Sequence, residues 1–146
     1  MSYSIDVNLL LYASDSSCPG HARAREFIRA CIEGPEVIGM AWVTIVSYVR
    51  IATHPSIFSS PMSHEEALSN VDSFMRQPQV RLLSEQDGFW ETYREVTSGL
   101  PVRGNQVPDA HLAALLKQHG IVTLYTCDAD FYRFRFLDVR NPLEVR

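Results

Sequence analysis

The sequence predicts an α/β fold: a three-layer sandwich with a mainly parallel five-stranded sheet and helices on both faces. Short apolar strand candidates alternate with amphipathic helical segments along all 146 residues. No internal repeat, low-complexity segment or long linker interrupts this alternation. The alternation is typical of parallel sheets, because each crossover helix covers one face of the sheet. We therefore expect one domain over residues 1–146, with the carboxyl ends of the strands at one edge.

The predicted elements follow apolar periodicity and breaker residues. The strands are expected at residues 3–5, 37–40, 80–83, 121–126 and 136–139. The helices are expected at residues 8–13, 21–33, 41–53, 63–77, 84–98 and 108–119, with a short helical turn after residue 128.

Several residues predict where these helices begin and end. Ser63 and Glu66 have the spacing of a capping box at the start of one helix. Pro108 suits the first turn of the last long helix, and Gly120 is expected at its C′ position. In the helix expected from Ser84, Phe89, Trp90, Tyr93 and Val96 are predicted to face inward.

The composition is that of a globular protein, with 46% hydrophobic and 21% charged residues. The net charge of −4 argues against a strongly basic nucleic-acid binder, although nucleic acid held through metal ions remains open. Cys18, Cys31 and Cys127 are odd in number and widely spaced, which predicts free thiols in a reducing compartment. No signal peptide or membrane-spanning run is evident, so we expect a soluble, cytoplasmic protein.

Three aspartates are predicted to meet at the carboxyl edge of the sheet. Asp6 follows the first strand, Asp128 follows the fourth, and Asp109 lies in the first turn of the helix before that fourth strand. Ligands of open α/β sheets bind outside this edge. Ionised carboxylates a few ångströms apart raise one another's pKa unless a cation lies between them. Oxygen-rich clusters suit Mg²⁺ or Mn²⁺, and Asn8 and Asp130 are further candidates to hold water or support the ligands.

Each acid also has a purely structural interpretation. Asp6 before an apolar segment is an ordinary helix N-cap. Asp109 suits the positive end of a helix dipole. Asp128 or Asp130 suits the cap of the short helix that follows, and for Asp130 we favour the cap over a metal ligand. It is their convergence on one edge that indicates a site.

Other chemistry is less well supported. His111 is expected to be a partly buried or surface imidazole. Ser47 is not in a Gly-x-Ser-x-Gly nucleophile elbow, and there is no glycine-rich phosphate loop. Arg133, Arg135, Arg140 and Arg146 make the C-terminal segment basic, for which a solvated face is the default interpretation. Such residues would also suit a phosphodiester substrate beside an acidic metal site.

Four segments together resemble the PIN-domain ribonucleases, and most closely the VapC toxins of bacterial toxin–antitoxin pairs. They are residues 5–13 (Ile-Asp-Val-Asn-Leu-Leu-Leu-Tyr-Ala), 107–114 (Val-Pro-Asp-Ala-His-Leu-Ala-Ala), 126–131 (Thr-Cys-Asp-Ala-Asp-Phe) and 42–55, which ends in Thr-His-Pro. The resemblance covers nearly the whole chain.

This resemblance implies Mg²⁺- or Mn²⁺-dependent cleavage of RNA. Asp6, Asp109 and Asp128 match the acidic positions of the family, with Asp6 and Asp109 expected to hold the main ion. The family also implies a fourth acid, usually Glu, at the position of Ser47, three residues before Arg50. Ser47 and Arg50 are themselves candidates to support the metal ligands or position the substrate. It further implies a homodimer blocked by a small VapB-like antitoxin that binds near the first helices.

Two other classes of function stay open at this point. One is a PIN-like module that binds RNA or an antitoxin without cutting, as the absence of an acid at Ser47 suggests. The other is a receiver or phosphatase, which would place a Lys beside the acids. The only lysine in the chain is Lys117, well inside a predicted helix, so this class ranks last.

Overall fold

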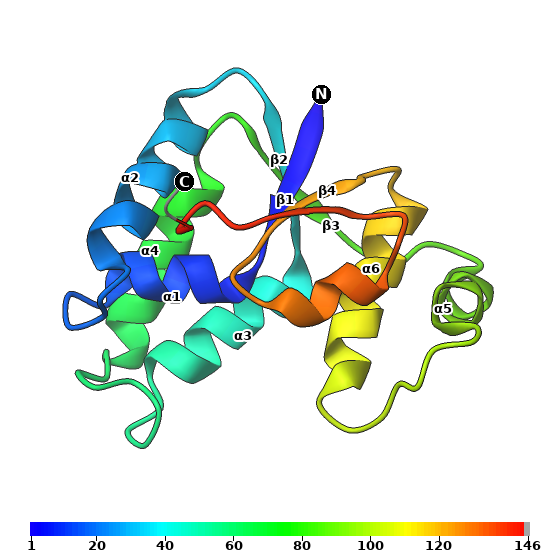
Figure 1. The fold of residues 1–146 in the computed structure, drawn as a ribbon. Coiled ribbons are helices and arrows are strands. Elements are labelled where there is room, and N and C mark those ends of the chain that lie inside the picture. The colour runs from blue at the N-terminus through cyan, green and yellow to red at the C-terminus, as the bar shows by residue number, and fades with distance from the viewer. Residues whose placement is uncertain (145–146) are drawn as a thin grey trace.

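The computed structural model describes residues 1–144, so Arg146 and the expected domain end at residue 146 lie outside the described residues. Strands and helices alternate as predicted (Figure 1). The strands are β1 (Ser2–Ile5), β2 (Val37–Ala41), β3 (Val80–Leu83), β4 (Thr123–Tyr125) and β5 (Asp138–Arg140). The helices are α1 (Val7–Ser14), α2 (His21–Glu33), α3 (Trp42–Ala52), α4 (His64–Met75), α5 (Phe89–Thr97), α6 (Gln106–Gln118) and the short 3₁₀ helix η1 (Ala129–Arg133).

The strands form one five-stranded sheet in the order β3-β2-β1-β4-β5, and every pairing is parallel. In the central pair, Ser4 aligns with Leu124 and Ile5 with Tyr125. The chain order reverses at this pair, because β2 and β3 lie on one side of β1 while β4 and β5 lie on the other. Crevices that bind ligands in open α/β sheets form where the strand order reverses. The residues that follow β1 and β4 are therefore at the position where a site is expected.

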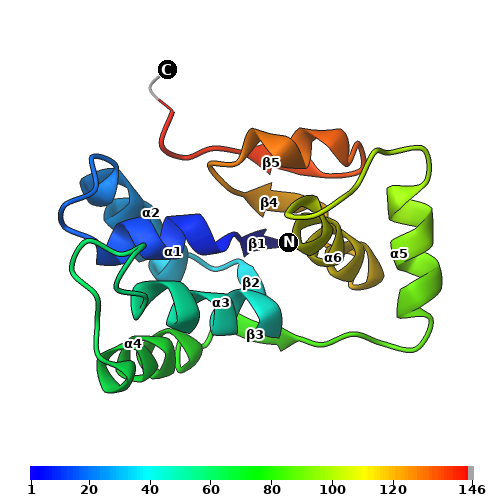
Figure 2. The same ribbon diagram turned by 90° about the horizontal axis from the view of Figure 1, so that it is seen from below.

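Helices cover both faces of the sheet, as the view from below shows (Figure 2). Alternate residues of a strand point to opposite faces. Tyr3 and Ile5 pack with α1 to α4, whereas Leu124 packs with α6 and η1. On the α6 side, Gly39 leaves space for Ile121, whose Cδ1 would lie 2.6 Å from an added Cβ. The core on this face packs apolar residues of α6 against those of the sheet.

The predicted fold class is confirmed, and so are several of the helix ends. The Ser63 hydroxyl accepts a hydrogen bond from Glu66 N and donates one to the Glu66 carboxylate. Gly120 follows α6 with a φ of 69°, the left-handed conformation expected of a C′ glycine.

Some predicted boundaries and one predicted inward residue are wrong, although Phe89, Tyr93 and Val96 pack inward as predicted. Ala41 ends β2 instead of beginning a helix, and α5 begins at Phe89 instead of near residue 84. Gly88, with a φ of 83°, ends the preceding turn and permits this later start. Trp90, predicted to face inward, is 62% exposed and stacks on Tyr93 at the surface. The fourth strand ends at Tyr125, so that Asp128 lies beyond its end in the segment leading to η1.

Candidate metal centre

Asp6 joins the end of β1 to the start of α1. Its backbone N–H donates to Tyr125 O of the neighbouring strand at 2.9 Å, which fixes the residue at the edge of the sheet. Its Oδ1 accepts from Val7 N at 2.8 Å, so Asp6 is the N-cap of α1, as one of the two interpretations predicted. Asp6 Oδ2 accepts from the Thr126 hydroxyl at 2.7 Å. The carboxylate is thus held in one orientation while its other lone pairs remain free to accept.

Thr126 connects the two acidic segments. Besides donating to Asp6, its hydroxyl accepts from the backbone N–H of Asp128 at 3.0 Å. Asn8 donates its amide to the same hydroxyl at 3.2 Å and accepts from Cys127 N at 3.4 Å. The turn after β4 is therefore tied to the turn after β1 by side chains that are partly or fully buried.

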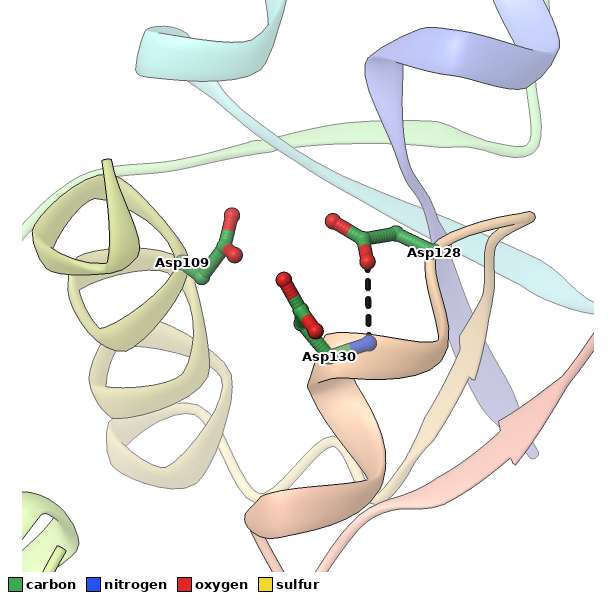
Figure 3. A group of neighbouring side chains, drawn as sticks. All are labelled: Asp109, Asp128 and Asp130. Atoms are coloured by element: carbon green, nitrogen blue, oxygen red, sulfur yellow. Dashed lines mark hydrogen bonds between the residues drawn. The ribbon is translucent and has the colours of Figure 1, made fainter. Parts of the chain in front are cut away.

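The carboxylates of Asp109, Asp128 and Asp130 point toward one another across the gap between α6 and η1 (Figure 3). One oxygen of each lies within 4.8 Å of one oxygen of both others. Asp109 is in the first turn of α6, and Asp128 is the N-cap of η1, where its Oδ1 accepts from Asp130 N at 2.9 Å. Because η1 makes one tight turn, it brings Asp130 to the same side as its own cap.

The electrostatics of these acids show mutual repulsion. The pKa of Asp109 is raised to about 6, first by burial and then by the charges of Asp128, Asp6 and Asp130. Arg133 acts in the opposite direction on this pKa. The pKa of Asp6 is also raised, mainly by burial and further by Asp128, although the hydrogen bonds from Thr126 and Val7 oppose the increase. The four carboxylates therefore share one electrostatic environment, and a cation would relieve their repulsion.

The donor set suits a hard divalent cation. It contains only carboxylate oxygens, which are typical ligands of Mg²⁺ and Mn²⁺ and not of soft metals. Two oxygens on opposite sides of one Mg²⁺ lie about 4.2 Å apart, since each is about 2.1 Å from the ion. The observed limit of 4.8 Å requires only a small side-chain movement or one bridging water. The residues present therefore fit such an ion.

The structure brings together most, but not all, of the residues singled out from the sequence. Asp109 and Asp128 meet, and Asp6 lies near enough for its charge to act on Asp109. Asn8 lies against Asp6, with its amide 3.4 Å from Oδ2. Within residues 1–144, no hydrogen bond or ion pair joins Ser47 or Arg50 of α3 to the acids.

The structure also shows the environments of Asp130 and His111, two further residues considered from the sequence. We expected Asp130 to cap the short helix, but the cap is Asp128, and the Asp130 side chain points toward Asp109 instead. His111 is partly buried, one of the two predicted environments, and its Nε2 is 2.6 Å from Glu85 Oε1.

Sequence reasoning missed two residues of this region. A threonine at the end of a strand, such as Thr126, looks like an ordinary β-branched core residue, and only its place two residues before Asp128 gives a signal. Arg133 was grouped with exposed arginines, yet its side chain is only 22% exposed. Its spacing of three residues after Asp130, one turn of a 3₁₀ helix, is the signal in the sequence.

Fold and acids together define an α/β protein with a candidate metal centre at the carboxyl edge of a parallel sheet. The family model that matches the chain is the PIN domain, over residues 3–137. The chain belongs to the PIN-domain family, which confirms the resemblance noted from its sequence.

Named relatives and solved structures extend this assignment. The chain is 37% identical over 142 residues to Ribonuclease VapC48 of Mycobacterium tuberculosis, covering 97% of this chain and 98% of that protein. It is 30% identical to Ribonuclease VapC43 of the same species over 140 residues, covering 96% and 95% of the two chains. The structure of VapC20 from M. tuberculosis, described as a Sarcin-Ricin loop cleaving toxin, superposes with a TM-score of 0.68 at 17% identity, covering 94% of this chain and 98% of VapC20.

A second solved structure is VapBC2 from Rickettsia felis bound to a DNA fragment from their promoter. It matches with a TM-score of 0.68 at 18% identity, over 97% of this chain and 98% of that one. Across residues 1–144, no helix has both the length and the apolar character needed to span a membrane.

Proposed function

We propose that this protein is a metal-dependent endoribonuclease that hydrolyses RNA phosphodiester bonds as the toxin of a toxin–antitoxin pair. The observation that carries the proposal is the convergence of Asp109, Asp128 and Asp130, with Asp6 beside them, at the carboxyl edge of the sheet. Membership of the PIN-domain family and the 37% identity to a VapC ribonuclease support it.

The roles of the residues follow from their positions. Asp6, Asp109 and Asp128 are the proposed metal-binding and catalytic acids, and Asp130 is added to them because its carboxylate points into the same group. Hydrogen bonds of Thr126 and Asn8 fix the position of Asp6 relative to the turn at Asp128. When bound, Mg²⁺, or Mn²⁺ in its place, supplies Lewis-acid activation of water and offsets charge on the scissile phosphate.

Cleavage of a labelled RNA by the purified protein in Mg²⁺ tests the proposal. We expect cleavage by the wild type and its loss in Asp6→Asn and in Asp109→Asn, with circular dichroism unchanged. RNA cleavage at the wild-type rate by Asp6→Asn would refute the assignment. The alternative is a module that binds RNA or antitoxin without cutting, which the missing acid at Ser47 favours. RNA binding without cleavage by the wild type in Mg²⁺ would select that alternative.

We infer that the partner is a VapB-like antitoxin whose apolar helical segment binds a groove between α1, α2, α3 and α4. The groove has a volume of about 370 Å³ and is lined by apolar side chains that include Leu10, Ile28, Ile45 and Phe74. Two solved structures similar to this chain, VapBC2 from Rickettsia felis and a toxin–antitoxin complex from Klebsiella pneumoniae, support this inference.

Two serines of α4 allow a matched test of this groove. Ser73 lines it, whereas Ser69, one helical turn earlier, does not, and both side chains are exposed. Ser73→Arg should prevent co-purification with a co-expressed antitoxin, and Ser69→Arg should not. Equal complex formation by both variants would contradict this placement.

A homodimer is the further proposed assembly. Trp42 and Val46, one turn apart on α3, are 44% and 62% exposed, which leaves an apolar stripe on this helix. Light scattering should give a dimer mass for the wild type and a monomer mass for Val46→Asp. A monomeric wild type would exclude the dimer.

A further inference from the structure

We propose that Arg133 is a substrate-positioning residue that binds a phosphate oxygen of the RNA backbone beside the metal centre. The inference rests on the proposed function and adds a residue that the acidic motif does not include. Arg133 is the last residue of η1, the same short helix whose first turn carries Asp130.

The guanidinium of Arg133 is held in place at one end. Its Nε donates to the backbone carbonyl of Asp130 at 3.0 Å, across one turn of η1. The side chain is only 22% exposed, so that packing restrains the aliphatic part as well. A long cationic side chain normally loses considerable rotamer freedom when it binds a ligand. Here the protein has already immobilised it.

The hydrogen-bonding capacity of the same group is largely unused. A guanidinium has five N–H donors. Within residues 1–144, Nη1 is buried without a partner. Nη2 is 3.9 Å from Asp130 Oδ1, too far for a hydrogen bond, and unlike Nη1 it is not sealed off from solvent. A fixed cation with an accessible donor is thus left unsatisfied, although leaving charged donors unpaired is costly.

The location of Arg133 indicates which ligand would use this donor. Its charge acts on Asp109, and Nη2 faces Asp130, so the guanidinium borders the group of carboxylates at which the substrate phosphate must arrive. An anionic oxygen is the natural partner of this donor, because arginine forms strong charge-assisted hydrogen bonds with phosphate.

RNA affinity measured without metal tests this role separately from catalysis. All proteins would carry Asp109→Asn to prevent cleavage, and anisotropy of a labelled single-stranded RNA would be read in EDTA. Arg133→Gln should weaken binding roughly tenfold, the loss of one charge-assisted hydrogen bond. It should also reduce the salt slope of log K by about 0.7, the value for one phosphate contact on a single strand.

Arg135 provides the matched control. It lies two residues further along the chain with an exposed side chain, and Arg135→Gln removes the same charge without removing the anchored donor. We expect Arg135→Gln to change the RNA affinity less than twofold, an estimate in line with the weak effect of exposed charges. Equal weakening by both variants would show a general effect of net charge and overturn the proposal.

Arg133→Lys covers the case in which Arg133→Gln does not fold. It keeps the positive charge but loses the Nε anchor, and we expect affinity between that of the parent and that of Arg133→Gln, about threefold below the parent, since lysine binds phosphate as a point charge. Unchanged RNA affinity in Arg133→Lys would show that a positive charge alone is sufficient, and would overturn the role proposed for the anchored guanidinium. Cleavage of RNA in Mg²⁺ by the protein without any substitution is assayed in parallel. If that protein cleaves RNA while Arg133→Gln binds RNA as tightly as its parent, this inference fails and the proposed ribonuclease function does not.

Discussion

Asp109→Asn should stabilise the metal-free protein while abolishing its response to metal. The pKa of this carboxyl is about 6 against an ordinary value of 3.8, which corresponds to about 3 kcal/mol acting against its ionised form at neutral pH. Because the side chain is partly exposed, solvent screening reduces this penalty to about 1–2 kcal/mol. The substitution also removes a favourable interaction with the N-terminus of α6 worth about 0.5 kcal/mol.

The net gain in the free energy of unfolding is therefore about 1 kcal/mol, which raises the Tm by about 3 °C in a domain of this size. The sign follows from linkage. Between pH 4 and 6 the folded wild type binds more protons than the unfolded chain, because its Asp109 pKa is raised. Its stability should thus fall as pH rises through this window, and that fall should be smaller in Asp109→Asn.

Differential scanning fluorimetry in EDTA and in Mn²⁺ measures both effects. The wild type should gain stability with Mn²⁺, and Asp109→Asn should start higher in EDTA and gain little. Asp130→Asn is an informative comparison, because its carboxylate is the more exposed and its loss should raise the metal-free Tm less. A lower Tm for Asp109→Asn in EDTA would refute the reasoning, since it would mean that the ionised carboxylate makes a net stabilising contact.

Three further predictions concern pH, the threonine link and the packing of the sheet. Mn²⁺ affinity, measured by calorimetry, should fall as pH is lowered through about 6, because protons compete for Asp109; a pH-independent affinity from 7 to 5 would contradict the raised pKa. Thr126→Val should weaken Mn²⁺ binding about tenfold by releasing Asp6 and the Asp128 turn, whereas Thr123→Val, at the start of β4, should not; equal affinities of the two variants would remove Thr126 from the site. Gly39→Ala should destabilise the protein by about 1 kcal/mol in urea unfolding, because its Cβ would lie 2.6 Å from Ile121 Cδ1 and the ends of the Ile121 and Leu83 side chains would have to move; wild-type stability would show that this face is loosely packed.

The sequence predicted the sheet well because its signals are local. Asp6 follows a short apolar strand and precedes an apolar helix, and both boundaries can be read from adjacent residues. The capping box at Ser63 and the C′ glycine Gly120 are likewise set by side chains within one turn of the helix end. Such features depend little on tertiary contacts.

The features that the sequence did not predict depend mainly on contacts between segments that are far apart along the chain. Asp130 faces Asp109 because η1 is a 3₁₀ helix packed beside α6, and so short a helix has no periodic pattern to reveal its orientation. Thr126 acts through Asp6, which lies 120 residues away in sequence. Trp90, in the first turn of α5, is exposed and stacks on Tyr93, whereas Phe89, Tyr93 and Val96 of the same helix pack against the core.

Ser47 is the position at which this chain differs from the acidic pattern expected of the family. The family expectation is an acid at this position, and the hydroxyl present has no hydrogen bond to the acids within the described chain. Asp130, which is in the group of converging carboxylates, supplies an additional acid from another element. The proposed centre therefore draws on Asp6, Asp109, Asp128 and Asp130.

The most direct measurement is the anomalous difference density of a crystal soaked in Mn²⁺. We predict one strong peak between Asp109, Asp128 and Asp130, with an Asp6 oxygen beside it or one water away. We also predict that the peak disappears in Asp109→Asn. Well-ordered carboxylates that point away from one another, with no peak at this edge of the sheet, would contradict the existence of a metal centre.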